Sequence, residues 1–198
     1  MGVAERKKRE RDDRERRITA AARQIATAEG WEAVTIRRLA EAIEYSQPVL
    51  YSHFANRDAI VAAVAVEGFR ELADALQCAP EGHTDGRDAM RAVASAYLAF
   101  AWKQPAIYEA MFAMPTGLRF AEADAPPAAR DAFAALAAVV PAGDVETATE
   151  TFWAALHGLV ELDRAGRIRP SAREERLTLA VNGLLGHEGY AVAVSTKD

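Results

Sequence analysis

The chain contains little cysteine, proline or glycine and has no long hydrophobic run. Cys78 is the only cysteine, so no internal disulfide can form, and a lone thiol suits a reducing compartment. No stretch approaches the roughly 20 apolar residues of a membrane-spanning helix, and the charged N-terminus lacks the apolar segment of a signal peptide. These absences argue against the membrane-spanning and disulfide-rich secreted classes and predict a cytoplasmic protein.

The motifs of the common enzyme classes are also missing. The sequence has no glycine-rich phosphate loop, no paired metal-ligand spacing and no nucleophile motif. His187 and Glu188 begin the zinc-binding pattern HExxH, but its second histidine is absent. We therefore expect no enzymatic activity, no catalytic residue, no cofactor and no metal.

Alanine and charged residues, in contrast, are abundant. Hydrophobic residues make up 51% of the 198-residue chain, and only 8 prolines and 12 glycines interrupt it, which predicts an all-α fold. The net charge of −5 is unevenly divided, because residues 1–60 carry +2 and residues 61–198 carry −7. This division would keep the acidic part away from a polyanion while the N-terminal part binds it.

Residues 1–12 are charged at nearly every position and show no apolar periodicity. They predict a charged flexible arm that leads into the first helix. The arginines of this segment could reach a DNA minor groove or phosphates, or they could simply form a solvated, salt-bridged helix start. Both interpretations remain open from the sequence.

Residues 13–56 have the pattern of a helix-turn-helix domain. Helical spacing of Ile18, Ala21, Ala22 and Ile25 predicts a first helix that ends at Gly30. Thr35 is a suitable N-cap for a second short helix, and Ser46 for a third that spans 47–53 and carries Pro48 in its first turn. Two short helices with apolar inner faces and a tight connection indicate a helix-turn-helix.

Residues 57–198 are expected to form a second, larger helical domain. Asn56 is a suitable cap for a long helix that reaches about Gln77 and could connect the two domains. Proline and glycine positions divide the remainder into predicted helices at 88–102, up to 113, 128–140, 146–164 and 171–186, with a loop at 114–127.

The segment around the predicted turn resembles a known family. TIRRLA at 35–40, SQPVLYSHF at 46–54 and NRDAI at 56–60 resemble the DNA-binding domain of TetR-type repressors over about 45 residues from Arg17. Glu44 departs from the family, which usually has glycine at this turn position; a left-handed conformation there would cost roughly 1 kcal/mol. The resemblance implies a homodimeric regulator of palindromic operator DNA.

Residue chemistry and the resemblance together suggest a DNA-binding surface. The Gln47 amide could pair with adenine, and Val49 could contact a thymine methyl group. The resemblance implies phosphate contacts for Tyr51 and His53, although His53 could instead be a solvated helix residue. Leu50 and Phe54 are assigned to the core. The full predicted DNA-binding set is Thr35, Arg37, Ser46, Gln47, Pro48, Val49, Tyr51, His53 and Arg57, where Thr35 contacts phosphate and Arg57 replaces a backbone-contacting lysine.

The C-terminal half shows a weaker resemblance. TFWAALHGL at 151–159 is similar to the Trp-x-x-x-His-Gly signature of one group of TetR C-terminal domains. The family pairs its last two long helices in a four-helix dimer interface, and both helices have apolar faces here. The predicted dimerisation residues are Phe152, Leu156, Leu159, Val181, Leu184 and Leu185.

Aromatic and methionine side chains crowd the region before and within that signature. They could line an apolar cavity for a small-molecule effector or form an ordinary core. For His157, which shares a helix face with Trp153, a core role is slightly favoured over ligand contact. The predicted ligand-binding residues are Tyr97, Trp102, Tyr108, Met111, Phe112, Trp153 and His157.

Two regulatory hypotheses follow from these features. In the first, a small apolar or aromatic ligand releases a repressor from its operator by favouring a conformation whose recognition helices no longer match the groove spacing. In the second, a TetR-like DNA-binding protein has no small-molecule inducer and is constitutive or controlled by a protein partner.

Overall fold

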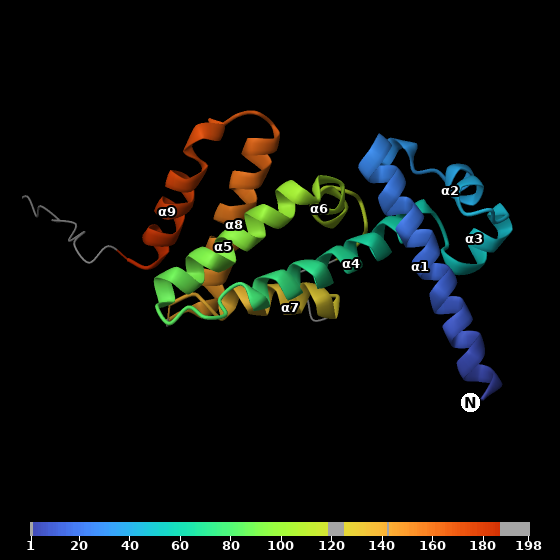
Figure 1. The fold of residues 1–198 in the computed structure, drawn as a ribbon, viewed down its shortest axis with the longest axis horizontal. Helices are drawn as coiled ribbons and strands as arrows, with labels where there is room; N and C mark the ends of the chain where they lie inside the picture. Colours follow the sequence, from blue (N-terminus) through green and yellow to red (C-terminus); the bar gives the residue numbers. More distant parts are fainter. Residues whose placement is uncertain (1, 119–124, 142, 187–198) are drawn as a thin grey trace, which may run out of the picture. The chain divides into compact units, whose positions relative to one another are not determined.

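The computed structural model describes residues 2–118, 125–141 and 143–186. Within these ranges the chain forms nine α-helices, two 3-10 helices and no β-strand, which confirms the predicted all-α class (Figure 1). In order, the elements are α1 Val3–Glu29, η1 Trp31–Ala33, α2 Ile36–Ala42, α3 Gln47–His53, α4 Arg57–Cys78, α5 Gly86–Lys103, α6 Pro105–Phe112, α7 Pro127–Ala137, α8 Val145–Arg164, η2 Pro170–Ala172 and α9 Arg173–Leu184.

Helix α1 begins earlier than the sequence predicts. Residues expected as a flexible arm belong to one continuous helix from Val3 to Glu29. Arginine, lysine and glutamate are strong helix formers, and ion pairs at helical spacing, such as Arg6 with Glu10 and Arg11 with Glu15, join successive turns. Gly30, at φ 85°, ends the helix as expected.

The described residues divide into two compact units rather than at residue 57. The first unit comprises Met1–Ala75 and Ala99–Phe133, and the second comprises Leu76–Leu98 and Ala134–Asp198. Most of α4 and all of α6 therefore group with the helix-turn-helix. Packing is the reason: the Trp31 indole N–H donates to the Ala106 carbonyl at 2.7 Å, across 75 residues of sequence.

Helices α4 and α6 of the first unit approach each other closely at Gly68. A Cβ atom added to Gly68 would lie 2.6 Å from Ile107 Cγ2 and 2.8 Å from Met111 Sδ. The absence of a side chain is therefore what allows α6 to pack against α4 at this position. The Phe69 and Phe112 rings meet nearby, edge to face, with centroids 5.3 Å apart.

The second unit contains its own core between α8 and α9 and the first part of α5. Its largest interior side chains include Tyr97, Phe152 and Leu156, each less than 2% exposed. Arg91 of α5 donates to Thr178 and Glu174 of α9, at 2.6 and 2.8 Å. Within the described ranges, no helix combines the length and the apolar character needed to cross a membrane.

Candidate nucleic-acid interface

Helix α3 is anchored by one residue and exposes most of the others. Leu50 is fully buried, whereas Gln47, Pro48 and Tyr51 are exposed, Tyr51 by 53%; Val49 is half-buried. Pro48 lies in the first turn, where its missing N–H is not needed. This arrangement presents an amide, a phenol and apolar atoms on one outward face of the helix.

Helix α2 begins beside this face with a side-chain cap. Thr35 Oγ1 accepts a hydrogen bond from the Arg38 backbone N–H at 3.1 Å, as expected for an N-cap. The Arg37 side chain is 80% exposed and pairs with Glu41 of the next turn at 3.4 Å. Ser46, in contrast, precedes α3 without a side-chain cap hydrogen bond and is exposed.

His53, at the C-terminal end of α3, faces the protein rather than open solvent. Its side chain is only 6% exposed, and Nδ1 lies 3.3 Å from Glu15 Oε1 of α1. Burial alone would raise the pKa of Glu15, but hydrogen bonds with Arg11 and His53 outweigh it and leave that pKa lowered. The contact ties α3 to α1, and the predicted phosphate contact of His53 stays a prediction.

Arg57, at the start of α4, hydrogen-bonds to backbone carbonyls. Its Nε donates to Val34 at 2.8 Å and its Nη2 donates to Trp31 at 2.6 Å. These two carbonyls belong to the segment between α1 and α2. Arg57 therefore joins α4 to that segment, and a contact with DNA through its remaining N–H groups is still only predicted.

Glu44 adopts the left-handed backbone conformation expected at the turn. Its φ is 57°, the one positive φ of a non-glycine residue in the described ranges. Arg17 of α1 supports the next residue, because its Nη1 donates to the Tyr45 hydroxyl at 3.0 Å and its guanidinium lies 5.2 Å from the ring centroid. The turn is thus built without the family's glycine, beside a cation–aromatic contact from α1.

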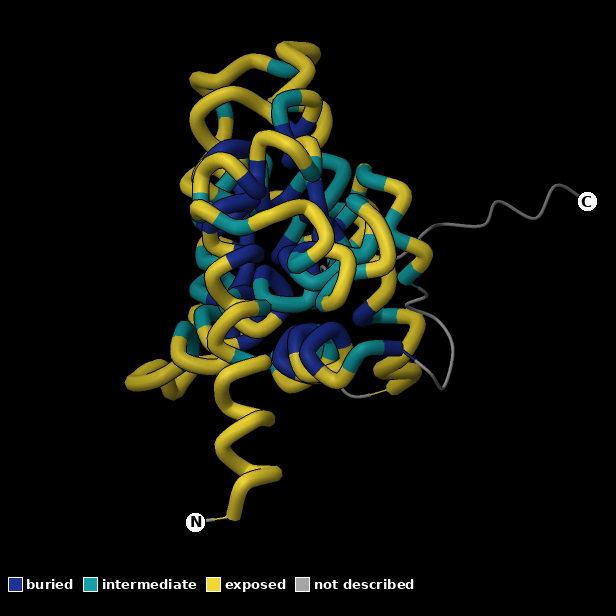
Figure 2. The backbone as a smooth tube through the Cα atoms, turned by 90° about the vertical axis from the view of Figure 1, so that its right-hand side faces the viewer, coloured by how far each residue is buried: buried dark blue, intermediate teal, exposed yellow. Residues whose placement is uncertain are grey.

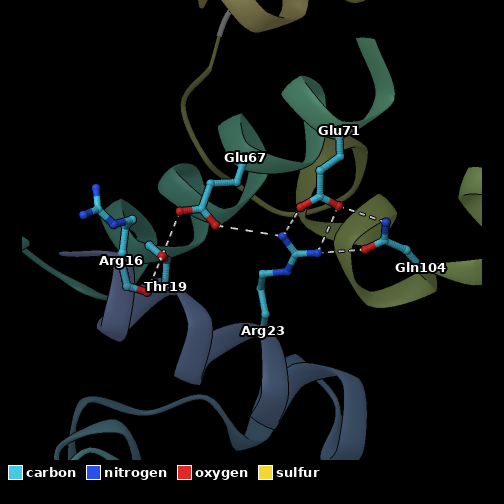
Figure 3. Close-up of polar contacts among 6 residues, drawn as sticks. All are labelled: Arg16, Thr19, Arg23, Glu67, Glu71 and Gln104. Atoms are coloured by element: carbon cyan, nitrogen blue, oxygen red, sulfur yellow. Dashed lines mark hydrogen bonds and ion pairs between the residues drawn. The ribbon is translucent and has the colours of Figure 1, made fainter. Parts of the chain in front are cut away.

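A polar cluster joins α1 to α4 and to the residue preceding α6 (Figure 3). Arg23 forms a two-pronged ion pair with Glu71 and donates to Gln104 Oε1 at 2.8 Å, while Gln104 donates back to Glu71 at 2.9 Å. Glu67 lies 4.0 Å from Arg23 and accepts from the Thr19 hydroxyl at 2.8 Å. The hydrogen bond from Arg23 is the main cause of the lowered pKa of Glu71.

Sequence reasoning did not identify this cluster or the contacts of Glu15 and Arg17. Arg23 and Glu71 are 48 residues apart, so no local pattern links them. The nearest available signal was the pair Glu67 and Glu71, one helical turn apart, which places two carboxylates on one side of α4.

The predicted ligand-binding residues fall into two groups, one in each unit. In the second unit, Trp153 Nε1 donates to the Tyr97 hydroxyl at 3.1 Å, and the His157 ring lies 6.5 Å from the Trp153 ring. Burial lowers the pKa of His157. Trp102, Tyr108, Met111 and Phe112 belong to the first unit, where the Tyr108 and Phe112 rings are 4.6 Å apart.

Half of the predicted dimerisation residues are interior residues of the single chain. Phe152 and Leu156 are fully buried and Val181 is 2% exposed, so these three pack within the unit and are not available to a partner. The other three, Leu159, Leu184 and Leu185, are half-buried. Leu162 of α8 and Leu179 of α9, which the sequence analysis did not select, are exposed by 43% and 68%.

Comparison with known proteins agrees with this architecture in both halves of the chain. Residues 18–64 match the family described as bacterial regulatory proteins, tetR family, and residues 90–184 match the tetracyclin repressor-like C-terminal domain. The HTH-type transcriptional regulator Rv0681 of Mycobacterium tuberculosis is 32% identical over 143 residues, a match that covers 70% of this chain and 64% of that regulator. The chain thus matches less than two thirds of the relative's length.

Solved structures share the fold at lower identity. A protein from Rhodococcus sp. RHA1 has a TM-score of 0.69 at 23% identity, with 86% of this chain and 92% of that chain covered. The TetR family transcriptional regulator PfmR from Thermus thermophilus has a TM-score of 0.56 at 21% identity, with 87% and 99% covered. The Trp-x-x-x-His-Gly group stays a prediction, but from both domain matches and the fold, the chain belongs to the TetR family.

Proposed function

We propose that the protein is a transcriptional repressor that binds palindromic operator DNA as a homodimer through α3. The observation that carries this proposal is the outward face of α3, where Gln47, Pro48 and Tyr51 are exposed around a single buried anchor, Leu50. A helix held in this way can enter the major groove, because its base-reading side chains are not needed for packing. Gln47 is suited to adenine and Tyr51 to phosphate.

The elements around α3 support its role as a rigid reading helix. Glu15 contacts its last residue, His53, and the Arg17–Tyr45 contact supports the turn that precedes it. Both contacts come from α1. DNA binding needs such support, because a recognition helix must keep its orientation to match the groove.

Binding measurements on Tyr51→Ala test the phosphate contact within this proposal. The substitution removes an exposed side chain, so the fold should be retained and affinity should fall alike for operator and mixed-sequence duplexes. Leu179→Ala, which shortens an exposed side chain of α9, is the matched control and should bind as the wild type does. Unchanged affinity of Tyr51→Ala in a gel-shift series would contradict the assignment.

Release by a small apolar or aromatic ligand is the regulatory part of the proposal. Tyr97, Trp153 and His157 support it, because they bring a phenol, an indole and a half-buried imidazole together in the second unit. The lowered pKa keeps His157 mainly neutral near pH 7, and a neutral imidazole is able to donate or accept a hydrogen bond.

Indole and a medium-chain fatty acid are suitable first probes for this regulatory site. We expect one of these ligand classes to quench Trp153 fluorescence and to weaken DNA binding, and both effects to be smaller in His157→Ala. If apolar compounds fail to bind, or bind without weakening operator affinity, the ligand part is wrong. A constitutive or partner-controlled regulator would then remain, with its DNA binding unaffected.

A further inference from the structure

The N-terminal turns of α1 extend beyond the packed part of the helix-turn-helix. Every residue from Gly2 to Arg11 is exposed, and buried positions begin only at Ile18. Figure 2 shows these turns as an exposed stretch of helix that leads to the N-terminus. Packing within the chain therefore does not account for the composition of residues 3–17, which we call the α1 extension.

The α1 extension carries an excess of positive charge that its own acidic residues only partly neutralise. Met1–Arg17 contains eight basic and five acidic residues. Three of the acidic residues pair within the helix, in the pairs Arg6–Glu10, Arg11–Glu15 and Arg16–Asp13. Lys7 and Arg14 are exposed and form no ion pair with any described residue, so their charges are available to a partner.

These two side chains lie on a defined face of the helix. Lys7, Arg11 and Arg14 follow helical spacing, and the same stripe continues as Ile18 and Ile25 on the buried side of α1. The basic stripe thus points to the side of α1 on which the helix-turn-helix packs. Glu15, one residue beyond Arg14, contacts His53, which places the end of the stripe beside the C-terminal end of α3.

We propose that the α1 extension is a rigid phosphate-binding element that contacts the DNA backbone beside the groove read by α3. The inference rests on the proposed DNA binding by α3 and deepens it. Lys7 and Arg14 are seven residues apart, about 10 Å along the helix, which corresponds to about three base-pair steps of duplex DNA. Arg11 lies between them and is held by Glu15.

Composition favours the DNA backbone over a lipid surface as the partner. Helices that bind membranes carry a wide apolar face with tryptophan, phenylalanine or leucine opposite their basic residues. In the α1 extension the apolar residues are Val3 and Ala4, and both lie in its first turn. Sequence-independent attraction to a polyanion is the interaction that such a helix can supply.

Two double substitutions of equal charge test the face of the helix as well as its charge. Lys7→Gln with Arg14→Gln removes the available charges, whereas Arg9→Gln with Arg16→Gln removes the same charge from the opposite side at the same spacing. Glutamine preserves helix propensity, so circular dichroism should be unchanged in both. The probe is a duplex of about 40 base pairs carrying the sequence that the full-length protein selects from a random pool, titrated at several salt concentrations.

We expect the first double variant to bind about tenfold more weakly and to reduce the salt slope by about 0.9 per lost phosphate contact in each protomer. The second should stay within about twofold of the wild type. Equal loss in both variants, or wild-type affinity in the first, would overturn the inference while leaving binding by α3 intact. Failure of the wild type to bind any duplex would instead overturn the proposed function, and the inference with it.

Discussion

At the scale of single residues, the turn between α2 and α3 is the feature most open to a quantitative test. Glu44 holds a φ of 57°, which costs a residue with a Cβ about 1 kcal/mol. Glu44→Gly should therefore raise the free energy of unfolding by about 1 kcal/mol, reduced by the greater freedom of glycine in the unfolded chain. Urea denaturation monitored by circular dichroism measures this change.

Glu44→Ala is the matched control for the turn. It removes the carboxylate but keeps the Cβ, so it should give no comparable gain. Equal stabilisation by alanine and glycine would show that the carboxylate, and not the backbone conformation, is responsible. DNA affinity of Glu44→Gly should remain within a few-fold of the wild type, because Arg17 still supports Tyr45 from α1.

Residue types and local order predicted the reading surface better than the roles of its edges. Pro48, Leu50 and Tyr51 lie as expected because helical spacing and one apolar anchor determine which side of a seven-residue helix is exposed. The surroundings of His53 and Arg57 depend on distant partners, namely Glu15 and the carbonyls of Trp31 and Val34. Local patterns carry no information about such tertiary contacts.

At the scale of elements, the ion pair between α1 and α4 is predicted to stabilise the first unit. In a double-mutant cycle, Arg23→Gln and Glu71→Gln should show a coupling of about 1 kcal/mol, because both side chains are only partly exposed. Arg23→Gln should cost more than Glu71→Gln, since it leaves Glu67 and Glu71 facing each other without a cation. Urea unfolding of the four proteins measures the coupling.

The exposed pair of Arg37 and Glu41 provides the control cycle, with an expected coupling of a few tenths of a kcal/mol. The pH dependence has a definite sign. Because the pKa of Glu71 is lowered below 4.5, its contribution is fully present above that pH and is lost as the pH falls through the lowered pKa. Equal coupling in the two cycles would contradict a special role for Arg23 and Glu71.

Helix boundaries were largely predictable, and the exceptions have physical causes. Predictions for α3, α4 and α8 agree with the structure to within about one residue because caps and apolar periodicity coincide there. The predicted arm at 1–12 is instead helical, because helix propensity and ion pairs one turn apart act where apolar periodicity is absent. Apolar patterning alone misses helices of this kind.

At the scale of the whole molecule, the proposed homodimer requires an apolar surface on α8 and α9. Leu179 and Leu162 provide exposed apolar atoms there, next to the half-buried Leu159, Leu184 and Leu185. Leu179→Lys places a charge on that surface and should shift the protein towards monomer by at least tenfold in dissociation constant, as measured by sedimentation.

Val145→Lys introduces the same charge at a position of α8 that is 39% exposed and lies in its first turn. This variant should remain as dimeric as the wild type. A wild type that is monomeric at all concentrations would contradict the homodimer, and equal dissociation in both lysine variants would locate the interface elsewhere. Loss of the dimer should also weaken operator binding, since two half-sites would no longer be engaged together.

The central claim is that α3 reads operator DNA, and in vitro selection from a random pool of duplexes tests it most directly. We expect the wild type to enrich a two-fold symmetric sequence whose half-sites lie about one helical turn apart, roughly 34 Å. Gln47→Ala should lose preference at one position of each half-site while keeping the same spacing. Failure of the wild type to enrich any sequence, or an enriched sequence unaffected by substitutions on α3, would contradict the account.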